Sequence, residues 1–129
     1  MAAISTQLFV ALRPGLVLCS PARINEDTLP EVLKQWDVIY SPPMENTGGF
    51  DADYLSRSIG SQWIDMNQFS INPKLVIVDR DQVGLIKLIE NHGIDVIPLK
   101  LRHSKMLRGG FHCITLDTRR KGTLERCFD

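Results

Sequence analysis

Cys113 is the residue of this chain whose type and surroundings best fit covalent chemistry. It directly follows the run Gly109-Gly110-Phe111-His112 and lies near the start of a strand that we expect over residues 111–116. The thiolate is the reactive form of cysteine, and glycines let a backbone approach a bound ligand closely. The sequence therefore indicates Cys113 as a candidate nucleophile.

The three histidines are the natural candidates for a base that would activate this thiol, but the local pattern favours another role for each. Neighbouring side chains of a strand point to opposite faces, so His112 is expected to face away from the substrate of Cys113 and to be structural. His103 lies in a polar loop and is expected to be solvated. His92 ends a predicted helix, where a partial positive charge is favourable.

Composition and charge exclude several classes of protein. The chain has 129 residues with 43% hydrophobic content, which is enough for the core of at most one domain. Fifteen basic and fifteen acidic side chains cancel, so neither nucleic acid nor an acidic membrane surface is expected as a partner. No apolar run approaches the roughly twenty residues that span a bilayer, and the first residues lack the basic segment of a secretory signal.

The cysteines favour a reducing, cytoplasmic setting. Cys19, Cys113 and Cys127 are odd in number, widely spaced and form no Cys-x-x-Cys pair. This pattern argues against a disulfide scaffold or a zinc site. Cys19 and Cys127 are each expected to be small buried hydrophobic residues.

The elements that must position Cys113 come from a unit that occurs twice, at about residues 8–41 and 66–100. The first copy is predicted to have strands at 8–12, 16–19 and 37–40 with a helix over 26–35, and the second has strands at 66–71, 75–78 and 95–98 with a helix over 81–91. Leu16 and Leu75 are 59 positions apart, and Asp37 and Asp95 are 58 apart. A near-constant offset across strand, helix and strand indicates a duplicated ββαβ unit.

Local signals support these boundaries. Asp81 is expected to cap the second helix and Gly93 to end it. The short β-branched runs are typical of strands buried on both faces. Residues 41–49 are expected to form a loop, and residues 51–60 fit a short helix. Two such units leave sheet faces and edges uncovered, so we expect further copies from additional sequence or from a partner chain.

The segment that carries Cys113 resembles the C-terminal part of the amidinotransferases, a family of the pentein superfamily that includes glycine amidinotransferase. The matching pattern is Gly-Gly-Phe-His-Cys followed by Asp117-x-Arg119-Arg120-x-Gly122-Thr123-Leu124. The resemblance implies an α/β fold of the pentein (α/β-propeller) type, with five ββαβ units around a pseudo-fivefold axis. Residues 1–129 are then a C-terminal fragment of one amidinotransferase domain, with about two units and a catalytic segment at 108–124.

The resemblance also implies a reaction. Cys113 matches the nucleophile that attacks the guanidino carbon of L-arginine, so that ornithine leaves and an amine acceptor later takes the amidino group. The acceptor is either glycine, which gives guanidinoacetate, or an amine of toxin or secondary-metabolite biosynthesis. Arg23 matches an arginine that binds the substrate carboxylate, and Ser61 matches a serine that contacts substrate; a surface salt bridge and a turn or cap residue are the plainer interpretations of these two.

No metal or organic cofactor is implied, because the covalent thiolate route needs none. The implied partners are the small-molecule substrates, with neither nucleic acid nor membrane. A homo-oligomer fits as well, since complete family members are often dimers.

The sequence departs from the family in two places. The family's His-Ile-Asp-type triplet, which supplies the proton-shuttling histidine, has no counterpart in residues 2–9, and the family's catalytic aspartate lies further upstream. Arg108 replaces the first glycine before the cysteine motif. We therefore expect little or no activity from this chain alone.

Two alternative functions stay open. One is a deiminase-type hydrolase, in which water resolves the covalent intermediate, although the Arg-Arg-x-Gly-Thr-Leu ending favours transfer to an amine. The other is a truncated remnant or binding module with no catalysis.

Overall fold

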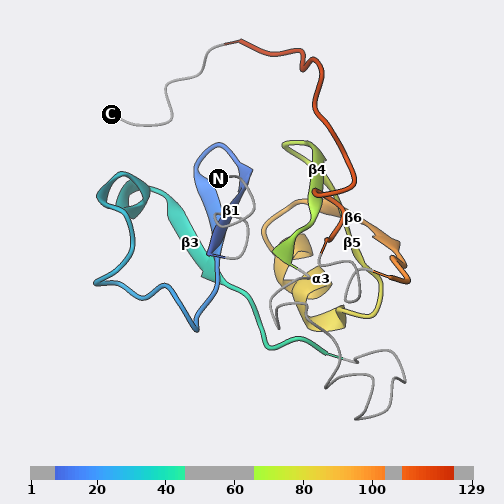
Figure 1. Cartoon of the computed structure of the whole chain (residues 1–129). Helices are drawn as coiled ribbons and strands as arrows, with labels where there is room; N and C mark the ends of the chain where they lie inside the picture. The colour runs from blue at the N-terminus through green and yellow to red at the C-terminus, as the bar shows by residue number, and fades with distance from the viewer. Residues whose placement is uncertain (1–7, 46–65, 104–108, 124–129) are drawn as a thin grey trace.

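A computed structural model of the chain describes residues 8–45, 66–103 and 109–123, and shows an α/β fold of two small mixed sheets (Figure 1). Residues 46–49 of the loop predicted over 41–49, and the helix predicted at 51–60, lie outside these residues. The first unit contains β1 (Phe9–Arg13), β2 (Leu16–Cys19), the 3-10 helix η1 (Glu31–Gln35) and β3 (Asp37–Tyr40). The second contains β4 (Phe69–Asn72), β5 (Leu75–Asp79), the α-helix α3 (Val83–Glu90) and β6 (Asp95–Leu99).

The two sheets have the same strand topology and the same irregularity in their hairpins. In each, an antiparallel hairpin is followed by a third strand that pairs in parallel, which gives the orders β1-β2-β3 and β4-β5-β6. The register shifts between Ala11 and Arg13 in the first hairpin and between Ser70 and Asn72 in the second. These shifts are 59 positions apart, as are Leu16 and Leu75, so the repetition seen in the sequence extends to the hydrogen-bond ladder.

Different residues close the two hairpin turns. Gly15 adopts a φ of 84°, a left-handed conformation that glycine reaches without steric cost. In the second turn, the backbone N–H of Lys74 donates to Oδ1 of Asn72 at 2.8 Å. An asparagine side chain that satisfies a backbone group two residues on is a common means of stabilising such turns.

The predicted helix over residues 26–35 is wrong for its first half. Asn25 and Thr28 close a turn there, in which Oδ1 of Asn25 accepts from the N–H of Thr28 at 2.9 Å and Oγ1 of Thr28 accepts from the N–H of Asn25 at 2.9 Å. Pro30 follows with an extended backbone, and only then does η1 begin. Proline disfavours helical geometry in the residue before it, and asparagine competes for backbone donors, so a full α-helix does not form.

The second helix is close to its predicted range but not to its predicted cap. Gln82 occupies the N-cap position without a side-chain capping bond, so the assignment of Asp81 as the cap is wrong. Asp81 instead forms an ion pair with Lys100, beyond β6. Gly93 ends the helical run, as expected, with a φ of 74° and an N–H that donates to the carbonyl of Glu90 at 2.9 Å.

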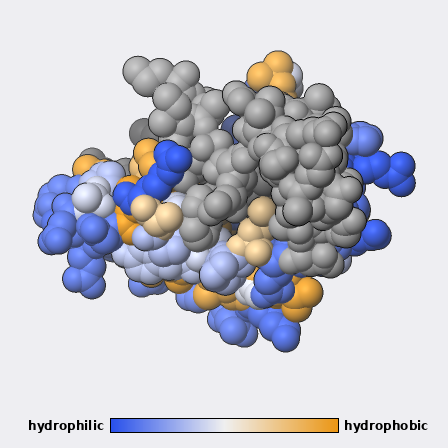
Figure 2. Space-filling model, turned by 60° about the horizontal axis from the view of Figure 1, so that its bottom comes forward, coloured by the Kyte–Doolittle hydropathy of each residue, from blue (hydrophilic) through white to orange (hydrophobic). Residues whose placement is uncertain are grey.

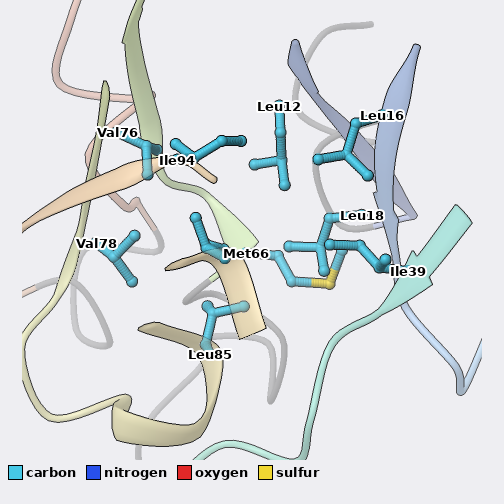
Figure 3. Packing of buried hydrophobic residues seen from close by; sticks show 10 residues of the cluster. Leu12, Leu16, Leu18, Ile39, Met66, Val76, Val78, Leu85 and Ile94 are labelled. Carbon is cyan, nitrogen blue, oxygen red and sulfur yellow. The ribbon is translucent and has the colours of Figure 1, made fainter. Parts of the chain in front are cut away.

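One apolar core joins the two units. Met66 lies between the two groups of side chains, with Leu18 and Ile39 of the first unit on one side and Leu85 of the second on the other (Figure 3). The cluster is completed by residues from both units: Leu12, Leu16, Val76, Val78, Ile89 and Ile94.

A second cluster covers the other face of the first sheet. Side chains alternate along β2, so Leu16 and Leu18 enter the shared core while Val17 and Cys19 pack with Ile24, Leu29 and Leu33. All four residues of β2 are therefore buried, which confirms the expectation for this strand. β3 differs, because Asp37 and Tyr40 are exposed.

The segment after β3 attaches the first unit to the second helix. Gln82 donates from Nε2 to the carbonyl of Glu45 at 2.6 Å and accepts from its N–H at 2.8 Å. On the face drawn in Figure 2, hydrophobic residues form small separate groups among hydrophilic ones. None of the helices in the described ranges has the length and apolar character needed to cross a membrane.

The shared core predicts a clear difference between two truncations. Leu18→Ala removes a fully buried side chain and is expected to lower the free energy of unfolding by about 2–5 kcal/mol. Val32→Ala, at a position that is 57% exposed, is expected to change it by less than about 0.5 kcal/mol. Urea unfolding followed by circular dichroism measures both, and equal effects would contradict a core shared at Leu18.

Candidate active site

Cys113 lies in a turn and not in a strand. Residues 111–114 form the turn, and residues 115–123 have no regular structure, so the strand predicted over 111–116 is wrong. The turn is closed locally by Thr115, whose N–H and Oγ1 both donate to the carbonyl of His112, at 3.2 and 2.9 Å. This backbone is therefore held by hydrogen bonds within the turn and by contacts to one distant residue.

That distant residue is Asn67, which is 46 positions from Cys113 in the sequence and only 4% exposed. Its backbone carbonyl accepts from the N–H of His112 at 3.2 Å, and its side-chain Oδ1 accepts from the N–H of Cys113 at 3.0 Å. Two consecutive amides of the turn therefore donate to the same buried residue. A buried polar group with such partners is stable only where the geometry of both is kept.

The glycine pair makes this approach possible. A Cβ on Gly110 would lie 2.5 Å from the carbonyl oxygen of Asn67 and 2.6 Å from its Cβ, which is closer than atoms can pack. A Cβ on Gly109 would lie 3.1 Å from the Cβ of Cys113. The glycines were expected to admit a ligand, and the close neighbours they admit in the structure are Asn67 and the cysteine itself.

The two cysteines that the structure describes have opposite environments. Cys113 is exposed, while Cys19 is fully buried. Burial raises the pKa of the Cys19 thiol, because a charged thiolate is disfavoured away from water. Cys19 is thus a core residue, as expected, and the accessible thiol is Cys113. Cys127 lies outside the described residues.

The argument that set His112 apart from Cys113 no longer applies, because it assumed a strand. His112 is exposed and lines a groove between β1 and β4. His92 has the structural role expected for it, since its Nδ1 lies 2.7 Å from the carbonyl of Leu88 within the helical run. His103 is exposed, as expected of a loop residue.

The groove beside His112 has a volume of about 520 Å³ and combines aromatic walls with polar groups. Arg120 and Gln68 line it together with three aromatic side chains, Phe9, Trp36 and Phe69. Gln68 is 2% exposed, and neither its Nε2 nor its Oε1 has a hydrogen-bond partner in the part of the chain that the structure describes. A buried amide without a partner costs free energy.

Arg120 fastens the segment after Cys113 to an edge strand. Its Nη2 donates to the carbonyl of Ser70 in β4 at 2.9 Å, and its Nε donates to Oδ2 of Asp117 at 2.7 Å. The guanidinium also lies over the ring of Phe69, 5.8 Å from its centre. The hydrogen bond from Arg120 is the main reason that the pKa of Asp117 is lower than usual. In Figure 1 this segment, drawn in red, leaves the second unit and passes beyond β4.

Of the other two predicted site residues, the structure describes only Arg23. Arg23 lies in the turn after β2 with its side chain exposed, and among the described residues no hydrogen bond or ion pair links it to Cys113. Ser61 lies outside the described residues. Within the described ranges, no three His, Cys, Asp or Glu side chains gather closely enough to hold a metal ion.

Sequence reasoning missed Asn67 and Gln68. Both fell inside a strand predicted from residue 66, whereas β4 begins at Phe69. Two consecutive amide side chains directly after Met66, at the start of a run expected to be apolar, were the available signal. In the sequence, Arg120 and Asp117 stand out only as part of the terminal pattern shared with the family.

Comparison with known proteins gives related sequences and structures. Inosamine-phosphate amidinotransferase 1 of Streptomyces glaucescens is 51% identical over 116 residues, which are 90% of this chain and 32% of that protein. Mitochondrial glycine amidinotransferase of Gallus gallus is 38% identical over 94% of this chain and 28% of its own length. The solved inosamine-phosphate amidinotransferase of Streptomyces griseus matches with a TM-score of 0.83 and 47% identity over 93% of this chain and 33% of that one.

This chain therefore spans about a third of the length of the curated relatives that it matches. No protein-family model matches it.

The close packing of Gly110 on Asn67 predicts that even a methyl group is not tolerated there. Gly110→Ala is expected to force the turn away from Asn67, to lower the free energy of unfolding by about 1–3 kcal/mol, and to speed hydrogen exchange at the amides of His112 and Cys113. Gly122→Ala is the matched control, because a Cβ there would meet no atom within 4 Å. Identical exchange rates in the two variants would show that the contact is absent in solution.

The Arg120–Asp117 contact predicts that the titration of the Asp117 carboxyl depends on Arg120. Because the pKa of Asp117 is lowered in the folded chain, the contact stabilises the fold above the usual aspartate pKa of about 3.9. This stabilisation is lost as the pH falls through the lowered value. Arg120→Ala is expected to move the Asp117 carboxyl titration, followed by NMR, up toward its usual range. Arg119→Ala should leave it in place, and an equal effect of both would point to general charge rather than this bond.

Proposed function

Because this chain is a homologue of the amidinotransferases, we propose that it supplies the nucleophilic cysteine, Cys113, of an enzyme that moves an amidino group from L-arginine to an amine. The observation that carries the proposal is the placement of Cys113. Its thiol is exposed, while the backbone behind it is tied to the buried Asn67 by two hydrogen bonds. An accessible thiol on a fixed backbone is what nucleophilic attack requires.

The first half-reaction forms a covalent intermediate. The Cys113 thiolate attacks the guanidino carbon of arginine, and a carbon–sulfur bond forms. The bond from that carbon to Nε of arginine then breaks, its electron pair stays on nitrogen, and a proton from a general acid completes ornithine. Cysteine is left carrying an amidino group, in which the positive charge of the former guanidinium is kept.

The second half-reaction regenerates the thiol. An acceptor amine attacks the amidino carbon, the carbon–sulfur bond breaks with its electrons on sulfur, and the amine loses a proton. The higher identity to an inosamine-phosphate amidinotransferase, 51% against 38% for a glycine amidinotransferase, supports an acceptor other than glycine. An inosamine phosphate is the acceptor that we propose.

The remaining parts of the reaction are proposed to need more than this chain. Residues 2–9 have no histidine where the family motif has its proton shuttle. We propose that the working enzyme holds further ββαβ units in a five-unit arrangement, of which this chain forms the last portion, and that these units provide the base and the acidic residues. Arg23 is proposed to bind the carboxylate of arginine and Ser61 to contact the substrate.

A chimera tests the proposal with the missing parts supplied. Residues 8–123 replace the matching third of the Streptomyces griseus inosamine-phosphate amidinotransferase, and release of ornithine from L-arginine is measured with and without the acceptor. The chimera is expected to release ornithine and to transfer the amidino group. Cys113→Ser is expected to reduce this on the order of a thousandfold or more, whereas Cys19→Ser, at a buried core position, should retain turnover.

The outcomes separate the candidate reactions. A folded chimera that keeps its turnover after Cys113→Ser would falsify the role of this cysteine. Release of citrulline or ammonia without any acceptor would replace transfer by hydrolysis. Mass spectrometry of the unmodified 129-residue chain with arginine is expected to show neither an amidino adduct nor ornithine.

A further inference from the structure

Asn67 lies beside the turn that carries Cys113, and its neighbours in the core show what holds it there. It follows Met66, which is 1% exposed in the shared core, and precedes the buried Gln68. Its backbone is therefore held by the packing of both repeat units. A polar side chain at such a place costs free energy unless its hydrogen bonds are made.

The two bonds that Asn67 accepts act on two adjacent peptide groups. The N–H of His112 and the N–H of Cys113 flank the α-carbon of His112, and they point to two oxygens of one residue, at 3.2 and 3.0 Å. Each N–H lies in its own peptide plane, since the peptide bond is planar, so the two bonds orient two adjacent planes. The α-carbon of Cys113 lies in the second of these planes and is positioned with it.

The glycine beside this contact removes the remaining freedom. Because a Cβ on Gly110 would overlap both the backbone and the side chain of Asn67, only a residue without a side chain fits at this contact. A slide that placed Phe111 there is therefore excluded.

We propose that Asn67 is a positioning residue for Cys113, which holds the backbone that carries the thiol against the core through its two oxygens. The proposal rests on the proposed function only in taking Cys113 as the reactive group. Asparagine suits the task because its side-chain oxygen accepts a hydrogen bond without bringing a negative charge next to a thiol that must ionise.

Two substitutions of Asn67 separate a positioning role from a general structural role. Asn67→Asp keeps an oxygen at the same place, and so keeps the hydrogen bond, but adds a negative charge near the Cys113 backbone. That charge disfavours the thiolate and is expected to move the midpoint of the Cys113 alkylation profile to higher pH by about half a unit or more. Asn67→Ala removes the acceptor and is expected to speed amide exchange at Cys113 at least tenfold.

The measurement is the rate of alkylation of Cys113 by iodoacetamide between neutral and alkaline pH, read by peptide mapping so that Cys19 and Cys127 do not contribute. Asn72→Asp is the matched control. Asn72 also accepts a backbone N–H through Oδ1, at 2.8 Å, but in the β4–β5 turn. His112 and Asp117, the titratable neighbours in the same segment, are unchanged in all variants.

The proposal is overturned if the Asn67→Asp profile coincides with those of the wild type and Asn72→Asp, or if Asn67→Ala leaves the exchange at Cys113 as it was. Should either variant fail to fold, the wild-type chain still decides: its His112 and Cys113 amides must exchange more slowly than those of Thr118 and Lys121. If the chimera kept its turnover after Cys113→Ser, the proposed function would be refuted. The result that Asn67 positions Cys113 would still stand.

Discussion

The apolar core shared by the two repeat units is the constraint on which the rest of the structure depends. Each unit is a three-stranded sheet with one short helix. Leu18 and Ile39 on one side and Leu85 on the other exclude water by meeting around Met66 (Figure 3). Because Met66 is fixed by both units, the residue that follows it is fixed too.

The residue after Met66 connects this core to the turn that carries Cys113. Asn67 extends the packed core by one residue and holds the backbone of the turn that carries Cys113. Arg120 ties the later part of the same segment to the carbonyl of Ser70 on the edge of β4. A segment with no sheet pairing of its own is thus anchored at two places on the second unit. The thiol between these anchors stays exposed while its backbone is held.

Burial alone distinguishes the two described cysteines. Cys19 ends β2, the most buried strand, and its thiol is disfavoured as a thiolate. Cys113 is at the surface on an anchored turn. The relatives of this chain are about three times as long as the part that it matches. Gln68, whose side-chain amide has no hydrogen-bond partner among the described residues, lines the groove between β1 and β4 together with His112.

The sequence by itself determined the strands, their repetition and the candidate nucleophile. β2 and β3 match their predicted ranges, because short β-branched runs between turn residues have one favourable conformation. The helix predicted over 26–35 failed on local chemistry that was visible, at Asn25 and Pro30. The strand predicted at 111–116 failed for a reason that was not: its amides donate to Asn67, 46 residues away. Local propensity describes a residue and its neighbours, whereas a hydrogen bond between distant segments exists only once the core has brought them together.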